Sequence, residues 1–238
     1  MSLKEMIFRR KSVRSFVNAP IGPKTISMIE KFISEIKPLY ADIKVKATIV
    51  DRDEIKCICP WTTKQVIAIY TEDKPGAFLN VGFMFQQLDL YLADIGLGAC
   101  WLGMAQPEEK IEQDGLRFAM AMAFGKPKGN GQREDVLKFK RKNMNEISDL
   151  QDANLVPARL APSSVNSQPW YFTHEGEVIH TYCVHKGLLN KNLGNTNQID
   201  VGIALAHMYI ANEETFEFFK TENPEELKDH TYMGSFKI

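Results

Sequence analysis

The chain has 238 residues, of which 44% are apolar and 25% are charged. This composition is typical of a globular protein that buries a substantial core, and it excludes a disordered chain. The formal net charge of −1 at pH 7 argues against a protein that wraps DNA.

The charges are nevertheless unevenly distributed along the chain. Basic residues crowd residues 4–14 and again residues 126–142, whereas acidic residues gather in residues 213–229. Two basic clusters in a nearly neutral chain favour a binding site for a small anion. Solvated helix faces are the alternative interpretation, because they produce the same charge pattern.

The cysteines and the N-terminal sequence bear on the cellular compartment. The four cysteines are Cys57, Cys59, Cys100 and Cys183, and the Cys-Ile-Cys spacing fits neither a zinc knuckle nor a CxxC redox motif. We expect free thiols. Residues 1–16 lack the apolar segment of a signal peptide, and no window reaches about 18 apolar residues. The sequence therefore predicts a cytoplasmic protein without a membrane span.

In chain order, the first half of the sequence predicts helices and strands in alternation. Residues 3–9 and 21–36 have the apolar spacing of helices, the second starting near Lys24 and Thr25. Residues 44–51 and 64–72 predict strands. A long buried helix is expected from Asn80, ending at Gly96 and Gly98, and the apolar run of residues 116–125 predicts a third strand, buried on both faces.

The second half of the sequence starts with a linker. Residues 126–142 are rich in Gly, Lys and Pro, and residues 145–160 then predict a helix. Residues 170–184 predict a β-hairpin that turns at Glu175 and Gly176, and residues 199–219 predict a second long helix.

Segments of the second half repeat segments of the first half in the same order. Residues 177–186 resemble residues 65–74, and residues 199–208 resemble residues 79–88, at offsets of 112 and 120 residues; residues 145–152 resemble residues 25–32. Chance similarity between amphipathic segments is the alternative. The common order favours an internal duplication, with one pseudo-repeat over about 1–125, the linker over 126–142 and a second pseudo-repeat over about 143–238.

Several familiar catalytic motifs are absent from the sequence. The glycines of GLGACWLG (residues 96–103) do not have the GxGxxG spacing, and no lysine follows them as in a phosphate loop. His174 and His180 are too far apart for HExxH, and there is no GxSxG nucleophile motif.

Three other stretches carry residues suited to ligand binding. In RRKSVRSF, Arg10, Ser12 and Arg14 alternate along an extended segment, so that two guanidinium groups and a hydroxyl point to one side and suit a phosphate or a polarised carbonyl. In APSSVNSQPW, prolines fix the backbone, and short hydroxyl and amide groups can reach the edge of a planar heterocycle; a purely structural turn is the alternative. In GLGACWLG, glycines allow the backbone to approach a flat ring closely.

Together these stretches resemble motifs of the FMN-dependent nitroreductase family. The matching stretches are RRKSVRSF (residues 9–16), GLGACWLG (96–103), KRKNMNEI (140–147) and APSSVNSQPWYF (161–172). The resemblance implies an α+β fold, with helices packed on an antiparallel-dominated sheet in each of the two pseudo-repeats.

The resemblance also implies a cofactor and a reaction. FMN would take electrons from NADH or NADPH and pass them to a nitro compound, a quinone or another small acceptor, so that the flavin carries the chemistry and neither a catalytic side chain nor a metal is expected. Arg14 is the candidate to stabilise the negative charge of the reduced ring. The resemblance assigns these residues to FMN: Arg10, Ser12, Arg14, Trp101, Leu102, Gly103, Arg141, Pro162, Ser163, Ser164 and Asn166.

The order of the motifs departs from the usual pattern of the family. Arg10 and Pro162 are 152 residues apart, whereas most members separate these motifs by a few dozen residues and build their flavin sites at a dimer interface. A minority branch has the order found here. We therefore expect two degenerate half-sites fused in tandem, with one FMN per chain held by a monomer and without nucleic-acid or membrane partners. The alternatives are a non-catalytic flavin-binding or sensing module and an unliganded structural protein.

Overall fold

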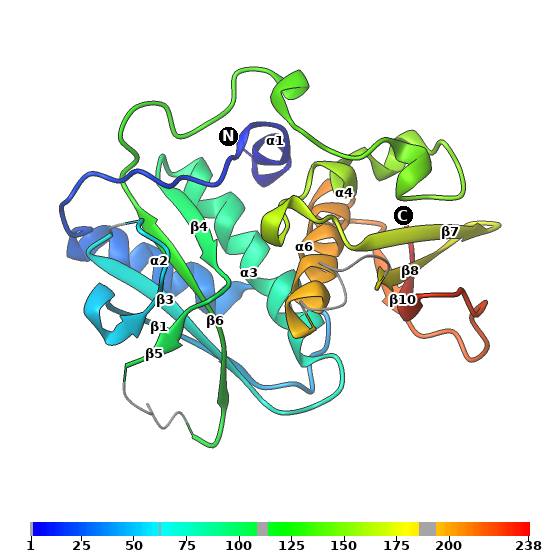
Figure 1. Cartoon of the computed structure of the whole chain (residues 1–238), viewed down its shortest axis with the longest axis horizontal. Helices are drawn as coiled ribbons and strands as arrows, with labels where there is room; N and C mark the ends of the chain where they lie inside the picture. The colour runs from blue at the N-terminus through cyan, green and yellow to red at the C-terminus, as the bar shows by residue number, and fades with distance from the viewer. Residues whose placement is uncertain (1, 62, 109–113, 186–193) are drawn as a thin grey trace.

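Two long helices lie side by side at the centre of the structure, with a β-sheet on either side (Figure 1). They are α3 (Ala77–Asp94) and α6 (Asn195–Ala211). The computed structural model describes residues 2–61, 63–108, 114–185 and 194–238. Lys186, at the end of one of the repeated segments, lies outside the described residues.

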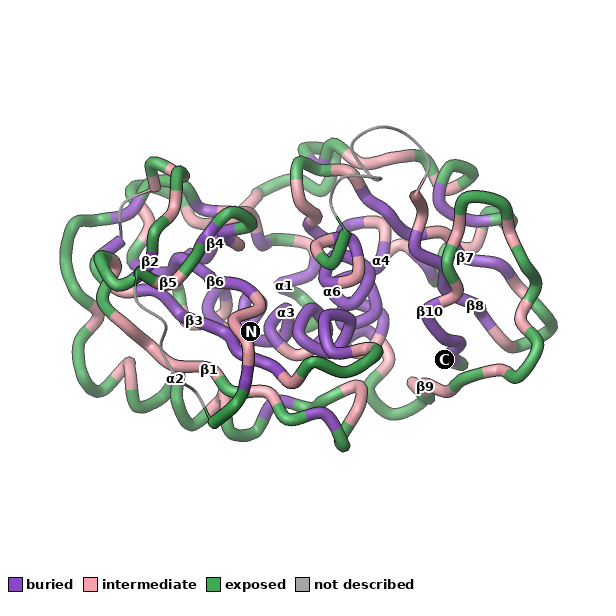
Figure 2. The backbone as a smooth tube through the Cα atoms, turned by 60° about the horizontal axis from the view of Figure 1, so that its bottom comes forward, coloured by how far each residue is buried: buried purple, intermediate pink, exposed green. Residues whose placement is uncertain are grey.

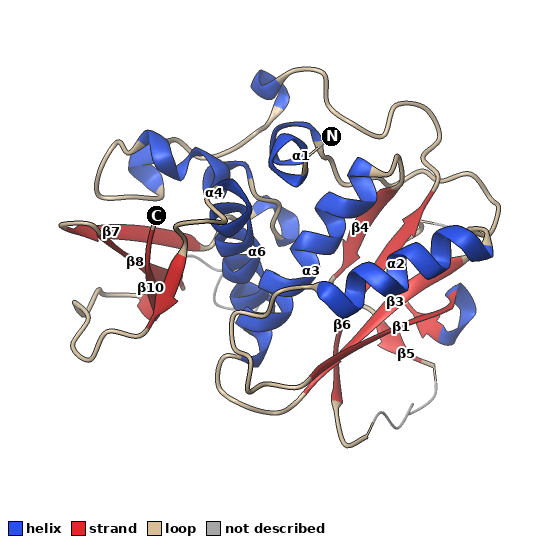
Figure 3. Ribbon diagram, turned by 180° about the vertical axis from the view of Figure 1, so that it is seen from behind, coloured by secondary structure: helices blue, strands red, loops and turns tan. Residues whose placement is uncertain are grey.

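The first half of the chain builds one sheet and the helices that cover it. Its elements before the central helix are α1 (Leu3–Arg9), α2 (Pro23–Glu35), β1 (Val45–Asp51), η1 (Arg52–Glu54), β2 (Ile55–Lys56) and β3 (Gln65–Thr71). After α3 come β4 (Gly98–Leu102), β5 (Gln106–Pro107) and β6 (Arg117–Gly125). Helix α2 lies over this sheet (Figure 3), and its residue Ile29 is fully buried.

The second half of the chain builds the other sheet. The connecting segment and its continuation contain η2 (Val136–Lys138), η3 (Met144–Glu146), η4 (Ala153–Leu155), α4 (Val156–Leu160) and η5 (Ser164–Asn166). The strands are β7 (Trp170–Glu175), β8 (Val178–Val184), β9 (Glu217–Phe219) and β10 (His230–Lys237), with α6 between β8 and β9.

The two four-stranded sheets have the same strand order. The first runs β1-β3-β6-β4 and the second β7-β8-β10-β9, while β2 and β5 form a separate two-stranded sheet. Every neighbouring pair is antiparallel. In each half, the strand that directly follows the central helix therefore becomes the edge of its sheet. The α+β fold with antiparallel sheets confirms the predicted fold class.

The central helices approach each other closely through two glycines. A Cβ atom on Gly82 would lie 2.0 Å from the backbone oxygen of Ile199, and one on Gly202 would lie 2.1 Å from that of Leu79. Neither position can carry a side chain without separating the helices. Both helices are buried along most of their length (Figure 2). The two segments that resemble each other in sequence, residues 79–88 and 199–208, therefore pack against each other in the core.

Most predicted elements are present, but the helix predicted over residues 145–160 is wrong. The structure has two 3₁₀ turns there and a helix of five residues, Val156–Leu160. Asp152 accepts a hydrogen bond from Asn154 N and so starts a new turn, while Pro157 is compatible only with the first turn of a helix. The apolar residues of this stretch therefore keep a helical spacing although the helix itself is interrupted.

The predicted boundaries of the long helices also need correction. Helix α3 begins three residues before Asn80, and Gly98, expected beyond its end, is the first residue of β4. Helix α6 ends at Ala211 instead of continuing to residue 219. Residues 217–219 instead pair with β10 as an edge strand. No helix in the described part of the chain is both long and apolar enough to cross a bilayer.

Candidate functional site

Two adjoining pockets lie where the two halves of the chain meet. We call them the apolar pocket, with a volume of about 280 Å³, and the basic pocket, with a volume of about 550 Å³. Both are lined by Ser12, Arg14, Pro162, Ser163 and Val165. The shared residues make the two pockets one continuous site, in the size range of pockets that hold small molecules.

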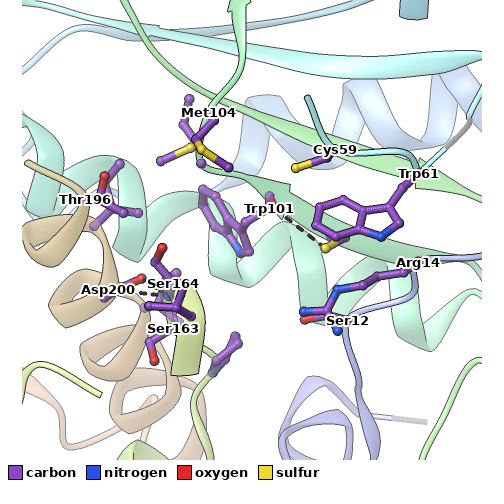
Figure 4. Close-up of a pocket in the computed structure, with 17 residues that line it drawn as sticks. Ser12, Arg14, Cys59, Trp61, Trp101, Met104, Ser163, Ser164, Thr196 and Asp200 are labelled. Carbon is purple, nitrogen blue, oxygen red and sulfur yellow. Dashed lines mark hydrogen bonds between the residues drawn. The ribbon is translucent and has the colours of Figure 1, made fainter. Parts of the chain in front are cut away.

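The apolar pocket has walls from both halves of the chain (Figure 4). Trp61, Trp101 and Arg14 come from the first half, while Ser164 and Asp200 face them from the second. The remaining lining residues are Ser12, Cys59, Cys100, Gly103, Met104, Met120, Pro162, Ser163, Val165, Thr196, Ile199 and Ile203. Two indole rings and several aliphatic side chains around one space suit a flat aromatic molecule.

The N-terminal segment reaches the site by running beside β4. Ser12 forms a parallel bridge with Ala99, and Val13 N donates to Ala99 O at 2.9 Å. A Cβ on Gly98 would lie 2.4 Å from Cγ2 of Val13, so this glycine makes room for the N-terminal segment.

Of the predicted FMN-binding residues at the end of β4, two line the apolar pocket and one lies in the core. Trp101 and Gly103 line the apolar pocket, and a Cβ on Gly103 would still lie 3.8 Å from Ser164 Oγ. Leu102 is buried in the core beside Val13 and is not among the residues that line either pocket.

Arg10 borders the basic pocket, but its side chain is almost completely buried, at 2% exposure. Its Nε lies 2.9 Å from Oδ2 of Asp89 on α3, and its Nη2 donates to Ser12 Oγ at 3.1 Å. Burial raises the pKa of Asp89, and the Arg10 charge opposes that rise. Arg10 therefore anchors the N-terminal segment to α3 and orients Ser12.

Positive charge is concentrated in the basic pocket without acidic side chains. Arg14, Arg133, Lys138, Lys140 and Arg141 line it together with Arg10, and no Asp or Glu is among its described lining residues. Burial, followed by repulsion from Arg10, lowers the pKa of Arg133 to about 10. Burial and three neighbouring arginines lower that of Arg141 to about 10. A bound phosphate would relieve this repulsion.

Arg141 connects the basic segment to the APSSVNSQPW stretch. Its Nη1 donates to Asn166 Oδ1 at 2.7 Å, and its Nη2 donates to Leu160 O at 3.2 Å. Asn166 Nδ2 in turn donates to Lys140 O at 3.0 Å. The two predicted binding residues thus hold each other in place at the edge of the basic pocket.

The backbone of the APSSVNSQPW stretch adopts left-handed conformations beside the pockets. Val165, Asn166 and Gln168 have φ angles of 47°, 57° and 48°, and positive φ is costly for a β-branched residue such as Val165. Hydrogen bonds from Gln168 N to Ser163 Oγ at 2.9 Å and from Ser164 N to both carboxylate oxygens of Asp200 at 3.0 Å hold the loop. Such strain is characteristic of functional loops.

A buried polar network lies behind the apolar pocket. Trp101 Nε1 donates to Gln86 Oε1 at 3.3 Å, and Gln86 Nε2 donates to Asp89 Oδ2 at 3.0 Å. Gln86 Nε2 also lies 3.1 Å from Nε2 of His207. The network therefore connects a tryptophan of the pocket wall to the Arg10–Asp89 ion pair and to α6.

The hydrogen bonds of His207 define its protonation state. Nδ1 must carry the proton, because it lies 2.9 Å from Pro157 O, which can only accept. Nε2 then accepts from Gln86. Burial lowers the pKa of His207 to about 3, so the imidazole is neutral at pH 7.

Asp200 has a structural counterpart in the other half of the chain. The repeated segments place it at the position of Asn80, 120 residues earlier. Asn80 Oδ1 accepts from Leu39 N at 2.8 Å and from Tyr40 N at 3.1 Å, just as Asp200 accepts from Ser164 N. His207 and Gln87 correspond in the same way, bonding to the backbone of Pro157 and Lys37 respectively.

Aromatic side chains pack beside Asn80, where the other half has the open pocket. The ring of Tyr40 packs edge-on against Phe218 of β9, with centroids 5.6 Å apart. Phe83 stacks with Phe216 at 6.2 Å. The two halves therefore share a framework, with a pocket beside Asp200 and packed aromatic rings beside Asn80.

Sequence reasoning missed several residues of the apolar pocket. Trp61, Met104, Thr196 and Asp200 belong to none of the motifs used. Asp200 could have been found from the repeat itself, because a carboxylate stands there in place of the amide of Asn80. The other three carry no local sequence signal.

Comparisons with known proteins identify relatives of the chain. A family model described as "Putative TM nitroreductase" matches residues 2–212. A crystal structure described as a putative nitroreductase from Thermotoga maritima is 19% identical, with a TM-score of 0.66, over 99% of this chain and 92% of that chain. A nitroreductase family protein from Clostridium difficile is 12% identical, with a TM-score of 0.52, over 64% of this chain and 99% of that chain. No curated protein matches.

Proposed function

Because the chain belongs to the nitroreductase family described as "Putative TM nitroreductase", we propose that it is an FMN-dependent NAD(P)H oxidoreductase. The observation that carries this proposal is the continuity of an aromatic pocket with a cationic one. FMN combines a flat apolar ring system with an anionic phosphate, and the two pockets match these two parts. When bound, FMN supplies the redox chemistry, taking electrons from NADH or NADPH and passing them to a nitro compound, a quinone or another small acceptor.

In this proposal the basic pocket binds the phosphate. Arg141, Lys138 and Lys140 supply positive charge at its rim. The pKa values of Arg133 and Arg141 are lowered first by burial and then by repulsion from neighbouring arginines, and an anion would remove that repulsion. Arg141 also has a buried Nε without a hydrogen-bond partner, a donor that a phosphate oxygen could satisfy. Arg10 acts indirectly, by holding Ser12 at the boundary of the two pockets.

The apolar pocket holds the ring system in this proposal. Trp101 and Gly103 come from the first half, and Pro162, Ser163 and Ser164 from the second. Arg14 lines both pockets and lies near the ring of Trp61, at 5.3 Å from its centroid. It is therefore the cation in reach of the ring system, where a positive charge stabilises the reduced form.

We further propose that the chain is an internal duplication that binds one FMN as a monomer. The common strand order of the two sheets and the reciprocal contacts of Gly82 and Gly202 support two related halves, residues 1–125 and 143–238. The aromatic packing of Tyr40 and Phe218 supports a single site. Because both walls of that site belong to one chain, no second subunit is needed to complete it.

Flavin binding followed by reduction tests the proposed function. The purified chain should bind FMN, anaerobic NADH or NADPH should bleach the flavin absorbance, and a nitroaromatic or quinone should restore it. A flavin that dithionite reduces but neither nucleotide does would indicate the non-catalytic flavin-binding or sensing module instead. A chain that binds no FMN at micromolar concentration would indicate the unliganded structural protein and refute both flavin proposals.

A further inference from the structure

Gln86 is a fully buried glutamine of α3 that lies behind the apolar pocket, with 0% exposure. It is not among the described residues that line either pocket. Its Oε1 accepts from Nε1 of Trp101 at 3.3 Å, and Trp101 itself lines the apolar pocket (Figure 4). Because the indole has only this one N–H donor, Trp101 offers the pocket an apolar ring surface.

The neighbours of Gln86 allow its amide only one orientation. Its Nε2 lies 3.0 Å from Oδ2 of Asp89 and 3.1 Å from Nε2 of His207. His207 can only accept at Nε2, because its Nδ1 donates to Pro157 O. The reversed amide would place Oε1 beside a carboxylate and an imidazole lone pair, and its N–H groups against the N–H of Trp101. The oxygen of Gln86 therefore stays directed at Trp101.

These hydrogen bonds join the two walls of the site from behind. They begin at Pro157 O, in the helix α4 that leads into the APSSVNSQPW stretch. They continue through His207 on α6 and Gln86 on α3, and they end at Trp101 on β4. The placement of the Trp101 ring in the first half is therefore linked to a backbone oxygen of the second half.

The framework that the two halves share does not account for Gln86. Its neighbour Gln87 has the polar counterpart His207 on α6, and both bond to a backbone oxygen of an earlier segment. At the same offset of 120 residues, the counterpart of Gln86 is Ala206, which has no polar side-chain group. A fully buried amide costs free energy unless its polar groups are bonded. An amide in this place therefore points to a task in the half that supplies Trp101.

We propose that Gln86 is a positioning residue of the flavin site, which fixes the indole of Trp101 as an apolar wall for the flavin ring. The inference rests on the proposed function and goes beyond it, because it assigns a role in cofactor binding to a residue that does not line the site. Without the Gln86 oxygen, the indole N–H has no buried acceptor, and the ring rotates until the N–H reaches the pocket or solvent. The flavin ring then loses a flat apolar surface and meets a polar group in its place.

Hydrogen exchange of the indole N–H groups tests the contact directly. The flavin-free protein is labelled with ¹⁵N at its tryptophan side chains, and the Trp101 signal is identified by its loss in Trp101→Phe. This signal should exchange at least about tenfold more slowly than that of an exposed indole, as expected for one buried hydrogen bond. A Trp101 N–H that exchanges as fast as an exposed indole in the wild type would overturn the inference, whether or not any Gln86 variant folds.

Two neighbouring glutamines provide a matched pair of variants. Gln86→Met keeps the length of the side chain but removes its oxygen, and it should abolish the protection of the Trp101 N–H. Gln87→Met is the control, because Gln87 is also buried on α3 but bonds to Lys37 O. It should leave the Trp101 signal unchanged. Unaltered protection of Trp101 in Gln86→Met would contradict the inference.

FMN affinity in a double-mutant cycle separates the positioning of Trp101 from support of the core. Gln86→Met should weaken FMN binding about tenfold, the effect of one lost hydrogen bond, whereas Gln87→Met should not change it. In a Trp101→Phe background, which has no indole N–H to hold, Gln86→Met should cause no further loss. A loss of the same size in that background, or equal losses for the Gln86 and Gln87 variants, would show that Gln86 only supports the core.

The two proposals fail in different ways. A chain that binds no FMN refutes the proposed function, while exchange of the indole N–H in the flavin-free protein still decides whether Gln86 holds Trp101. A chain that binds FMN and is reduced by NADH or NADPH, but whose Gln86→Met variant binds FMN as tightly as the wild type, leaves the proposed function standing and removes the role of Gln86.

Discussion

Gly82 and Gly202 form a reciprocal pair across the contact of α3 and α6. Each lacks the Cβ atom that would collide with a backbone oxygen of the opposite helix, at 2.0 Å from that of Ile199 and 2.1 Å from that of Leu79. Two surfaces related by a twofold axis make contacts of this kind, in which one residue's partner repeats on the other side. Here the contacts occur within a single chain, between the two helices that position the walls of the site.

Replacing either central glycine should destabilise the protein by a similar amount. Gly82→Ala and Gly202→Ala each force a backbone oxygen away from a new Cβ, and overpacking of this kind costs about 1 to 3 kcal/mol or more. Urea denaturation measures the loss. Gly22→Ser is the control, because Gly22 has no atom within 4 Å of its Cβ position and serine is a favoured helix N-cap. A large loss in only one of the two alanine variants would contradict the reciprocal contact.

Loss of the Arg10 charge should destabilise the fold as well as the site. Arg10→Met leaves Asp89 buried without its cation, which we expect to cost about 3 to 5 kcal/mol of the free energy of unfolding. The double variant Arg10→Met/Asp89→Asn removes the unpaired charge and should recover more than about 1 kcal/mol. If the double variant is no more stable than Arg10→Met in urea denaturation, the ion pair does not have this role.

The basic pocket should determine the affinity for the flavin phosphate. Lys140→Met removes one cation from its rim and should weaken FMN binding about ten- to hundredfold, the range of one charge-assisted hydrogen bond. The loss should shrink at high salt. Lys126→Met is the control, since Lys126 lies in the same linker but lines another pocket. Equal effects of the two substitutions in a fluorescence titration would argue against a phosphate in the basic pocket.

The neutral state of His207 should make the fold sensitive to acid. Its pKa is lowered to about 3 in the folded protein and is about 6.5 in the unfolded chain. Between these values only the unfolded chain binds the proton, so His207 reduces stability progressively as the pH falls from about 6.5 toward 3. His207→Gln, which copies Gln87 of the other half, removes this contribution.

Urea denaturation at several pH values checks the effect of His207. The stability of the wild type relative to His207→Gln should fall by about 2 kcal/mol between pH 7 and pH 5. His185→Gln, at a partly exposed position, should not change the pH profile in this way. Parallel profiles for the wild type and His207→Gln would show that the histidine already binds a proton in the folded state.

Local sequence signals were sufficient for most of the elements. The apolar spacing of residues 3–9 matches the burial of Met6 and Ile7, and the strand over 44–51 and the hairpin over 170–184 form where their β-branched and aromatic residues predict them. Residues 145–160 have a helical period as well, but Asp152 and Pro157 break the helix through side-chain capping and a missing N–H. Capping side chains and prolines decide whether such a stretch forms one helix or several turns, and the spacing of apolar residues does not reveal their effect.

The site could be predicted only in part, because its walls come from separate segments. The motif stretches identified Ser12, Arg14, Trp101, Ser163 and other lining residues, and the charge distribution indicated the basic segment. Burial, however, assigns Arg10 to an ion pair and Leu102 to the core. Trp61 reaches the pocket from a loop without a motif, and only the packing of the two halves brings it there.

The central claim is that one chain builds one complete flavin site between its two halves. Light scattering coupled to size-exclusion chromatography, with FMN quantified by absorbance, measures chain mass and stoichiometry together. We predict one FMN per 27.1 kDa chain in a monomeric species, and no recovery of binding when flavin-deficient Arg14→Ala and Asn166→Ala chains are mixed. Two FMN per chain, a flavin found only in dimers, or recovery of about half of the sites in the mixture would contradict the claim.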